Sequence, residues 1–207
     1  MLDLAEEKKL FFRGYKIIGA IDEAGRGPLA GPVVAACVVF NANISIKNQL
    51  SEVNDSKKLT ALKREKLFGL IKQNFIEVGV GLCDHHTIDK INILQATFLA
   101  MKKAIGTLKN KPDFLIIDGS MRLPNCSTPQ QAYIKGDERI FSIAAASIIA
   151  KVTRDKIMME MDKMYPNYGF AAHKGYGTKL HLEKLKQFGH CPIHRQSFNR
   201  VKGAGLV

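Results

Sequence analysis

The order of apolar segments along the chain predicts an α/β fold whose sheet is not purely parallel. Two strand-like runs come first, 16–21 and 33–40, and the tight turn between them favours an antiparallel hairpin. Strand-like and helix-like segments alternate along the rest of the chain, which is typical of a sheet flanked by helices. Because we find no internal repeat and no low-complexity linker, we expect a single domain over 1–207, with an α/β core to about residue 169 and a helical extension over about 170–207.

Each predicted strand is a short apolar run bounded by turn-forming or polar residues. The run 33–40 is β-branched and apolar on both faces, as expected of a central strand. Pro112 introduces a later run, and Gly79 and Gly81 lie on another. In chain order the predicted strands are 16–21, 33–40, 75–83, 114–117 and 131–135.

Helical spacing of apolar residues predicts the remaining regular structure. Thr60 is the expected N-cap of a helix that runs to about Gln73. An alanine-rich segment opens the longest predicted helix, and residues 166–169 end it. We expect helices over about 60–73, 93–108 and 140–164, a basic helical segment from about Thr178, and irregular structure over the polar residues 41–54.

The composition excludes several classes of protein. The 207 residues are 46% hydrophobic and 24% charged, which excludes wholesale disorder. No apolar run approaches the roughly 18–20 residues that span a bilayer. The first seven residues include Asp3, Glu6 and Glu7, where a signal peptide has basic residues and then an apolar block. We therefore expect a soluble cytoplasmic protein with no membrane partner, and we expect it to be a monomer.

The four cysteines lie far apart in the sequence and form no C-x-x-C pair, which argues against a zinc ribbon or a redox motif. We expect them to be reduced residues of the core. They are Cys37, Cys83, Cys126 and Cys191.

The charge is unevenly distributed. The chain has 31 Lys and Arg against 19 Asp and Glu, a formal net charge of +12, and residues 139–207 hold 12 of those bases and 4 of those acids. Lysines and arginines that neutralise phosphates release condensed counterions, so a basic C-terminal third suggests a polyanion partner. The alternative is a solvated helical surface.

Acidic residues follow three of the strand-like runs. They are the pair Asp22 and Glu23, then Asp118, and then Asp137. Carboxylates gathered at the carboxyl ends of strands would repel one another unless cations lay between them, and such oxygen ligands suit Mg²⁺ or Mn²⁺. Two such ions promote phosphodiester hydrolysis. Taken singly, each acid could instead be a turn or helix-cap residue.

The sequence around Asp22 and Glu23 carries two further expectations. Neighbouring residues on a regular strand face opposite ways, so both side chains reach one site only if the strand bends or ends there, which Gly25 allows. The segment 25–30 matches G-x-G-x-x-A, but a β-branched run follows it instead of a helix, which excludes a dinucleotide fold. We expect Gly25, Arg26 and Gly27 to approach a ligand closely, with Arg26 donating to it; a plain hairpin turn is the alternative.

Other short motifs have a functional and a structural interpretation. Lys57 and Lys58 beside a helix start suit a phosphate clamp, or are a solvated pair. Tyr176, between two glycines, could stack on a base or sugar, or lie in an ordinary loop. Asp155 is interpreted as an ion-pair partner on a helix surface. Residues 84–86, an Asp and two His, fit no common metal-site spacing and are predicted to be loop residues.

Taken together, these motifs resemble type 2 ribonuclease H, the ribonuclease HII family, over nearly the whole chain. The residues that carry the resemblance are IDEAGRGPLAGPVVAA (21–36), DSKKL (55–59), IDG (117–119), KGD (135–137), AASIIAKVTRD (145–155) and HKGYGT (173–178). The resemblance implies a ribonuclease H-like fold with a five-stranded mixed sheet, flanking helices and a C-terminal helical part that helps to hold the substrate.

The resemblance also implies an activity. It implies a metal-dependent endonuclease, with one or two Mn²⁺ or Mg²⁺ ions per site, that cleaves RNA in RNA–DNA hybrids and incises on the 5′ side of single ribonucleotides in duplex DNA. The products would carry 3′-hydroxyl and 5′-phosphate ends, as in ribonucleotide excision repair.

The resemblance assigns roles to the motif residues. The implied catalytic and metal-binding acids are Asp22, Glu23, Asp118 and Asp137, the last preferred over Asp155 because of its Lys-Gly-Asp context. The segment 25–27 would recognise the ribose 2′-hydroxyl, and Tyr176 would stack on the sugar at the RNA–DNA junction. Lys57 and Lys58 would hold phosphates, with no distinction between the two.

Overall fold

A computed structural model describes residues 2–46 and 48–202 of the chain. Its centre is one five-stranded sheet with the order β3-β2-β1-β4-β5. β1 pairs antiparallel with β2 and parallel with β4, so the sheet is mixed, as predicted. The strands are β1 (Ile18–Ala24), β2 (Val33–Phe40), β3 (Glu77–Cys83), β4 (Phe114–Asp118) and β5 (Gln130–Tyr133).

All five predicted strands are present, with ends that differ by a few residues. The largest difference is at β1, which was expected to stop at Ile21 and in fact continues to Ala24. The antiparallel ladder with β2 explains the difference, because it pairs Asp22 with Ala36 and Ala24 with Val34. Asp22 and Glu23 are therefore strand residues.

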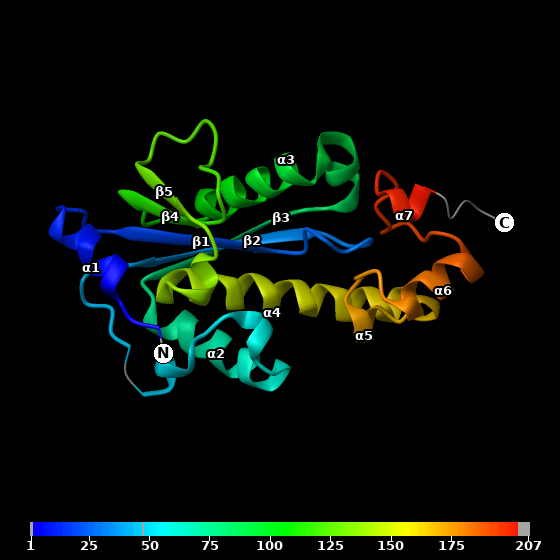
Figure 1. Cartoon of the computed structure of the whole chain (residues 1–207), viewed down its shortest axis with the longest axis horizontal. Helices are drawn as coiled ribbons and strands as arrows, with labels where there is room; N and C mark the ends of the chain where they lie inside the picture. The colour runs from blue at the N-terminus through cyan, green and yellow to red at the C-terminus, as the bar shows by residue number, and fades with distance from the viewer. Residues whose placement is uncertain (1, 47, 203–207) are drawn as a thin grey trace.

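Helices cover both faces of the sheet (Figure 1). α4 and α2 pack on one face, where Ala20, Ala36 and Val38 of the strands are buried among α4 residues. α3 packs on the other face against Ile21, Ala35 and Cys37. β2 is buried on both faces, as its sequence predicted. The helices are α1 (Ala5–Phe12), α2 (Ala61–Asn74), α3 (His85–Gly106), α4 (Phe141–Met164), α5 (Phe170–His173), α6 (Lys179–Phe188) and α7 (Asn199–Lys202).

The beginning of α3 differs from the prediction. The helix expected from about Ile93 begins at His85 and bends at Asn92, whose φ is 64°. The Asp84 carboxylate accepts a hydrogen bond from the Thr87 amide at 2.8 Å, which caps the first turn. The expectation that His85 and His86 are loop residues is therefore wrong, because an N-cap aspartate starts the helix before the apolar periodicity becomes regular.

α1 was not predicted from the sequence. Leu10 is buried, and the Glu7 carboxylate accepts hydrogen bonds from the amide and hydroxyl of Ser142, at 3.0 and 2.7 Å. Ile140, which precedes α4, has no side-chain cap of its own, so Glu7 supplies the acceptor from across the core. The Thr60 cap of α2, by contrast, is local and is found as predicted.

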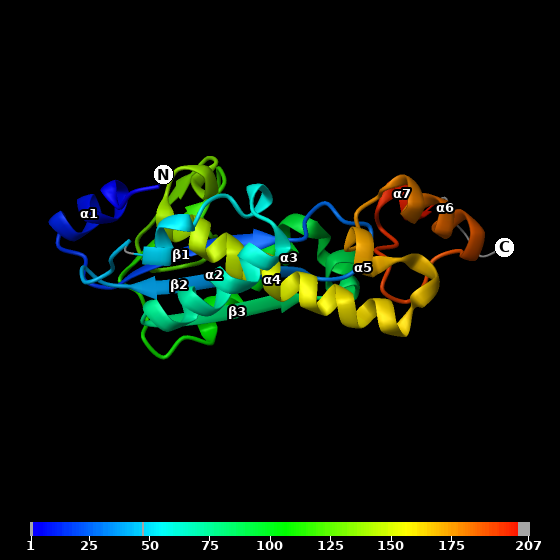
Figure 2. The same cartoon turned by 90° about the horizontal axis from the view of Figure 1, so that it is seen from below.

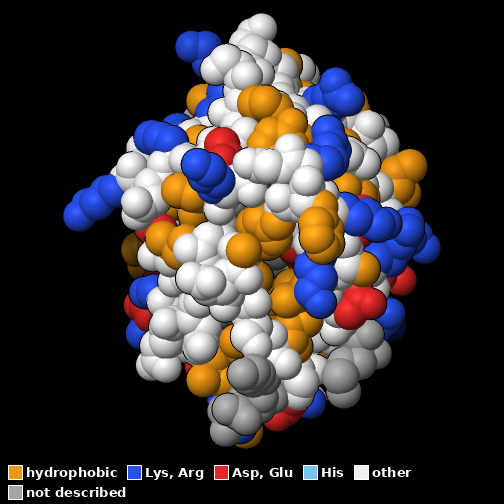
Figure 3. Space-filling model, turned by 90° about the vertical axis from the view of Figure 1, so that its left-hand side faces the viewer, with side chains coloured by type: hydrophobic (Ala, Val, Ile, Leu, Met, Phe, Trp, Pro, Cys, Tyr) orange, Lys and Arg blue, Asp and Glu red, His pale blue; other side chains and the backbone are white. Residues whose placement is uncertain are grey.

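Residues from about 170 onward form a C-terminal extension at one end of the sheet (Figures 1 and 2). Buried side chains from this part pack in two small clusters with Ala30 and Leu29, which precede β2. Figure 3 views the opposite end of the molecule, where Lys and Arg side chains lie among scattered hydrophobic patches.

The structure bears on the expectations about membrane-spanning segments and about the cysteines. In residues 2–46 and 48–202, no helix is long and apolar enough to cross a membrane. Cys37, Cys83 and Cys191 are buried free thiols, and Cys126 is a half-buried one, so the cysteines are core or near-core residues as predicted.

Candidate active site

A cavity of about 240 Å³ opens beyond the ends of β1 and β4. It brings together the four predicted acids, the segment 25–27, Lys57 and Tyr176, which lie far apart in the sequence. Lys58 is the one predicted site residue that does not line it. The full lining is Asp22, Glu23, Ala24, Gly25, Arg26, Gly27, Lys57, Asp118, Asp137, Ser147, Lys151 and Tyr176.

The sheet explains why the acids meet. β1 and β4 are neighbouring parallel strands, with Ile21 level with Ile117, so the residues that follow, Asp22 and Asp118, emerge at the same edge. β1 ends at Ala24, and Gly25 has a φ of +97°. The chain therefore turns directly after Asp22 and Glu23, and both carboxylates line one cavity despite being neighbours on a strand.

Asp137 is brought to the cavity through Asp118. It lies in a short 3₁₀ turn over Gly136–Glu138, directly before α4. The Asp118 Oδ1 accepts hydrogen bonds from the amides of Gly136 and Asp137, at 2.7 and 3.4 Å. A Cβ on Gly136 would lie 2.6 Å from the Ile143 side chain and 3.2 Å from this oxygen, so a side chain there would displace Ile143 and crowd Asp118.

Burial and mutual repulsion disfavour the ionised forms of three of these acids. Burial, followed by repulsion from Glu23 and Asp118, raises the pKa of Asp22 well above its ordinary value. Burial also raises the pKa values of Glu23 and Asp118, and the Asp137 charge raises that of Asp118 further. A cation among these groups would favour their ionised forms.

Two basic side chains partly balance this charge. The Lys57 ammonium lies 2.9 Å from the Asp137 carboxylate, and this hydrogen bond raises the pKa of Lys57. The Arg26 guanidinium lies 3.2 Å from the Glu23 carboxylate. Lys58 faces outward instead, with its ammonium 3.8 Å from Glu138. The structure thus separates two lysines that the sequence could not distinguish.

The chemistry of the donors fits a hard divalent cation. All four acids offer carboxylate oxygens, which Mg²⁺ and Mn²⁺ prefer. In the described part of the chain, no three His, Cys, Asp or Glu side chains form a closed ligand group. One or two carboxylates with water and substrate oxygens, the usual arrangement for Mg²⁺, would therefore complete the coordination.

Tyr176 forms the far wall of the cavity. The residue is 43% exposed, and a Cβ on Gly27 would lie 3.9 Å from ring atom Cε1. The Lys151 ammonium and the Arg154 guanidinium each lie 5.8 Å from the ring centroid. The ring is therefore held beside the segment 25–27 with one side open to solvent, as a stacking surface would be.

Ser147 and Lys151 also line the cavity and were not identified from the sequence. Ser147 hydrogen-bonds to Asp22 and lies 2.9 Å from the Ser56 hydroxyl. The Lys151 ammonium lies 2.7 Å from the Asp155 carboxylate. Asp155 itself does not line the cavity and is an ion-pair partner on α4, as predicted. Ser147 and Lys151 lie four residues apart in α4, a spacing that places them on one face of the helix. The neighbouring sequence does not show what that face contacts.

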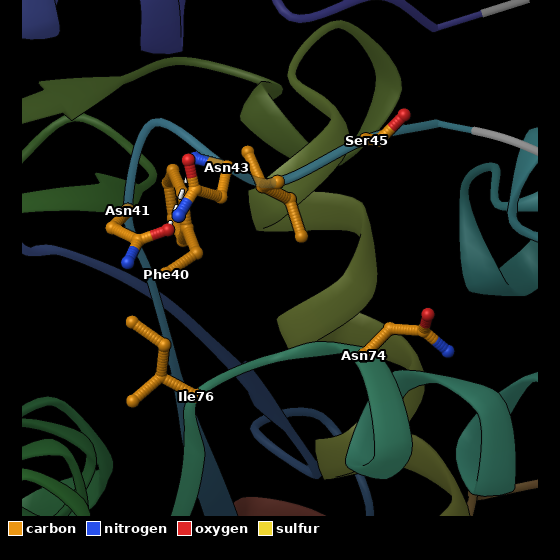
Figure 4. Close-up of a pocket in the computed structure, with 7 residues that line it drawn as sticks. Phe40, Asn41, Asn43, Ser45, Asn74 and Ile76 are labelled. Atoms are coloured by element: carbon orange, nitrogen blue, oxygen red, sulfur yellow. Dashed lines mark hydrogen bonds between the residues drawn. The ribbon is translucent and has the colours of Figure 1, made fainter.

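A second hollow, of about 160 Å³, lies after the end of β2 (Figure 4). It is lined by Phe40, Asn41, Asn43, Ile44, Ser45, Asn74 and Ile76. No ionisable side chain among these residues could transfer a proton or hold a phosphate. The carboxylate cavity is therefore the candidate active site.

Comparisons with known proteins agree with this geometry. The family model described as ribonuclease HII matches residues 18–201. A ribonuclease HII of Acetivibrio thermocellus is 57% identical over 194 residues, which is 94% of this chain and 74% of that protein. The crystal structure of ribonuclease H2 from Pyrococcus horikoshii superposes with a TM-score of 0.74 at 28% identity, covering 91% of this chain and 96% of that one. The ribonuclease HII solved in complex with PCNA from Archaeoglobus fulgidus superposes with a TM-score of 0.73 at 27% sequence identity. The match covers 88% of this chain and 95% of that one.

Proposed function

Since this chain belongs to the ribonuclease HII family and is a ribonuclease H enzyme, we propose that it cleaves the RNA strand of RNA–DNA hybrids and also incises on the 5′ side of single ribonucleotides in duplex DNA. The products would carry 3′-hydroxyl and 5′-phosphate ends. The observation that carries the proposal is the meeting of four carboxylates, the segment 25–27 and Tyr176 around one cavity.

Asp22, Glu23, Asp118 and Asp137 are the proposed catalytic and metal-binding residues. When bound there, one or two Mg²⁺ or Mn²⁺ ions supply the positive charge and Lewis acidity that phosphodiester hydrolysis needs. The carboxylates would hold these ions, and one of them would accept the proton of the attacking water. Asp118 also accepts hydrogen bonds from the amides of Gly136 and Asp137. It therefore positions Asp137 in addition to its own proposed catalytic role.

The rest of the cavity selects the substrate. The segment 25–27 lies beside the carboxylates and the Tyr176 ring, so a sugar that stacks on the ring places its 2′ position against this backbone. The 2′-hydroxyl is the group that distinguishes RNA from DNA. Lys57, whose side chain is largely exposed, is available to a phosphate; Lys58 lies outside the cavity and would contact a phosphate farther along the duplex.

The basic extension from about residue 170 would hold the duplex backbone. Its contribution is not sequence-specific, and it should weaken as salt concentration rises because phosphate contacts release counterions.

A cleavage assay on the purified protein tests the proposal. The substrates are a duplex with one ribonucleotide, an all-DNA duplex of the same sequence and an RNA–DNA hybrid, each with Mg²⁺, with Mn²⁺ and with a chelator. We expect metal-dependent cleavage of the hybrid and a single incision 5′ to the ribonucleotide. An all-DNA duplex cut as readily as the ribonucleotide duplex would favour a DNA nuclease, and binding without any product would favour a non-catalytic hybrid-binding protein.

A further inference from the structure

Two arginines beneath the candidate active site are completely buried. Arg154 of α4 and Arg195, in the segment before α7, are each 0% exposed. Within residues 2–46 and 48–202 neither guanidinium lies within ion-pair distance of a carboxylate. A buried charge without an opposite charge is costly, so its hydrogen bonds must offset the lost hydration.

The Arg195 side chain directs its hydrogen bonds to the loop between β1 and β2, residues 25–32. Its Nη2 donates to the Gly25 carbonyl at 2.6 Å, its Nη1 to the Arg26 carbonyl at 3.0 Å, and its Nε to the Gly31 carbonyl at 3.0 Å. The planar fork of a guanidinium offers several donors in fixed directions, which suits three carbonyl oxygens of one loop.

These bonds fix the direction of the neighbouring amides. In a trans peptide the carbonyl of one residue and the N–H of the next point in opposite directions, and the described chain has no cis peptide bond. Because the Gly25 and Arg26 carbonyls point at the buried Arg195, the N–H groups of Arg26 and Gly27 point away from it. Residues 25–27 line the cavity, so these two donors face the cavity side of the loop.

The segment that carries Arg195 is itself firmly held. The Arg195 amide donates to the Leu29 carbonyl at 2.8 Å, and the Gly31 amide donates to the Ile193 carbonyl at 2.9 Å. On the other side, the Asp89 carboxylate of α3 accepts from the amides of Gln196 and Ser197, both at 2.9 Å. Figures 1 and 2 show the same arrangement, with the β1–β2 connection reaching the C-terminal extension.

Arg154 fixes the far end of the same loop. It donates to the carbonyls of Ala30, Pro32 and Lys174, and its guanidinium lies 5.8 Å from the Tyr176 ring centroid. Burial lowers the pKa of Arg154 to about 10, and burial with the Arg154 charge lowers that of Arg195 to about 9. Both groups therefore keep all of their donors at neutral pH.

We propose that Arg195 is a positioning residue for ribose recognition: by holding the Gly25 and Arg26 carbonyls from below, it keeps the Arg26 and Gly27 amides directed at the 2′-hydroxyl of the substrate. This inference rests on the proposed function. It gives the extension a second task besides holding the duplex, since the residue that orients the recognition loop comes from the far end of the chain.

The test compares Arg195→Lys and Arg195→Met with the wild type. Lys keeps the charge but has one nitrogen to offer to three separated carbonyls, and Met keeps the length without donors. The readout is the discrimination between two duplexes of the same sequence. It is measured as the ratio of the inhibition constant of an unlabelled all-DNA duplex to the KM of the one-ribonucleotide duplex. We expect both variants to lose about tenfold or more of this ratio, as for one lost hydrogen bond to a polar ligand group, while the inhibition constant of all-DNA duplex stays constant.

A control separates loop orientation from general loss of stability. Leu67 is buried in α2, away from the loop, so Leu67→Ala destabilises the protein without touching residues 25–32. If its thermal midpoint falls as far as those of the Arg195 variants, Leu67→Ala should still keep the wild-type ratio of affinities for the two duplexes. An Arg195→Lys variant with the wild-type ratio, or one whose affinities for both duplexes fall equally, would overturn the inference.

Hydrogen exchange on the wild type decides the matter if neither Arg195 variant folds. The amides of Leu29 and Gly31 should exchange as slowly as those of β1, because the loop is fixed on both sides. Exchange at the rate of an open loop would show that the loop is not held and would overturn the inference. The proposed function fails separately, if the wild type itself does not cleave the one-ribonucleotide duplex.

Discussion

Removal of the Tyr176 ring should impair recognition of the nucleotide at the cleavage site with little effect on folding. Tyr176 is 43% exposed, and in the described residues its hydroxyl has no hydrogen-bond partner. Its contacts with Arg154 and Lys151 are both at 5.8 Å, and a cation–π contact of this kind contributes about 0.5–1 kcal/mol. Tyr176→Ala should therefore lower the free energy of unfolding only modestly.

The effect on substrate should be larger. Stacking of one nucleotide on an aromatic ring contributes about 1–3 kcal/mol, which corresponds to a factor of about 5 to about 150 in kcat/KM. We expect a loss in that range for incision at a single ribonucleotide and a smaller loss on a long RNA–DNA hybrid, where neighbouring ribonucleotides offer alternative binding positions. Tyr176→Phe keeps the ring and should retain nearly the full rate.

Steady-state cleavage of the two substrates by wild type, Tyr176→Phe and Tyr176→Ala measures these effects. Urea unfolding of the same samples shows whether a loss of activity reflects a loss of folded protein. Equal rates for wild type and Tyr176→Ala on both substrates would refute the stacking role. A Tyr176→Phe variant as impaired as Tyr176→Ala would show instead that the hydroxyl, and not the ring, makes the decisive contact.

Three further predictions concern catalysis and stability. Asp118→Asn should reduce metal-dependent cleavage by about a hundredfold or more, because a metal ligand contributes several kcal/mol, while most duplex binding remains; near-normal turnover would exclude Asp118 from the catalytic group. Burial raises the pKa of Glu7, so the stabilising contribution of this group is complete below its ordinary pKa and is lost as pH rises through the raised value. In urea unfolding, Glu7→Gln should therefore gain stability relative to wild type as pH rises above the ordinary pKa of about 4.5 and through the raised value; a stability difference that does not change with pH would contradict this. Gly81→Ala would place a Cβ 2.2 Å from the Ala100 carbonyl oxygen and should lower the free energy of unfolding by about 1–3 kcal/mol, whereas Gly69→Ala meets nothing within 4 Å and should raise it by about 0.5–1 kcal/mol; thermal unfolding of the pair checks the contrast.

Much of the secondary structure follows from local pattern. The β-branched run at β2 and the alanine-rich opening of α4 were located closely, because both lie within one element and are buried along most of their length. The Thr60 cap was predicted for the same reason, since an N-cap acts within one helical turn. α1 and the first turns of α3 were missed, because Glu7 acts on a helix more than a hundred residues away and Asn92 interrupts the apolar periodicity.

The sequence by itself determined the strands, most of the helices, the placement of acids after strands and the motifs that resemble the ribonuclease HII family. Tertiary structure decided which of these residues share a site. The parallel pairing of β1 with β4 brings Asp22 beside Asp118, and an ion pair with Asp137 separates Lys57 from Lys58. Arg195 shows the difference most clearly. Its sequence neighbours give no sign of its role, because its hydrogen-bond partners lie about 170 residues earlier in the chain and meet it only when the extension packs on the loop after β1.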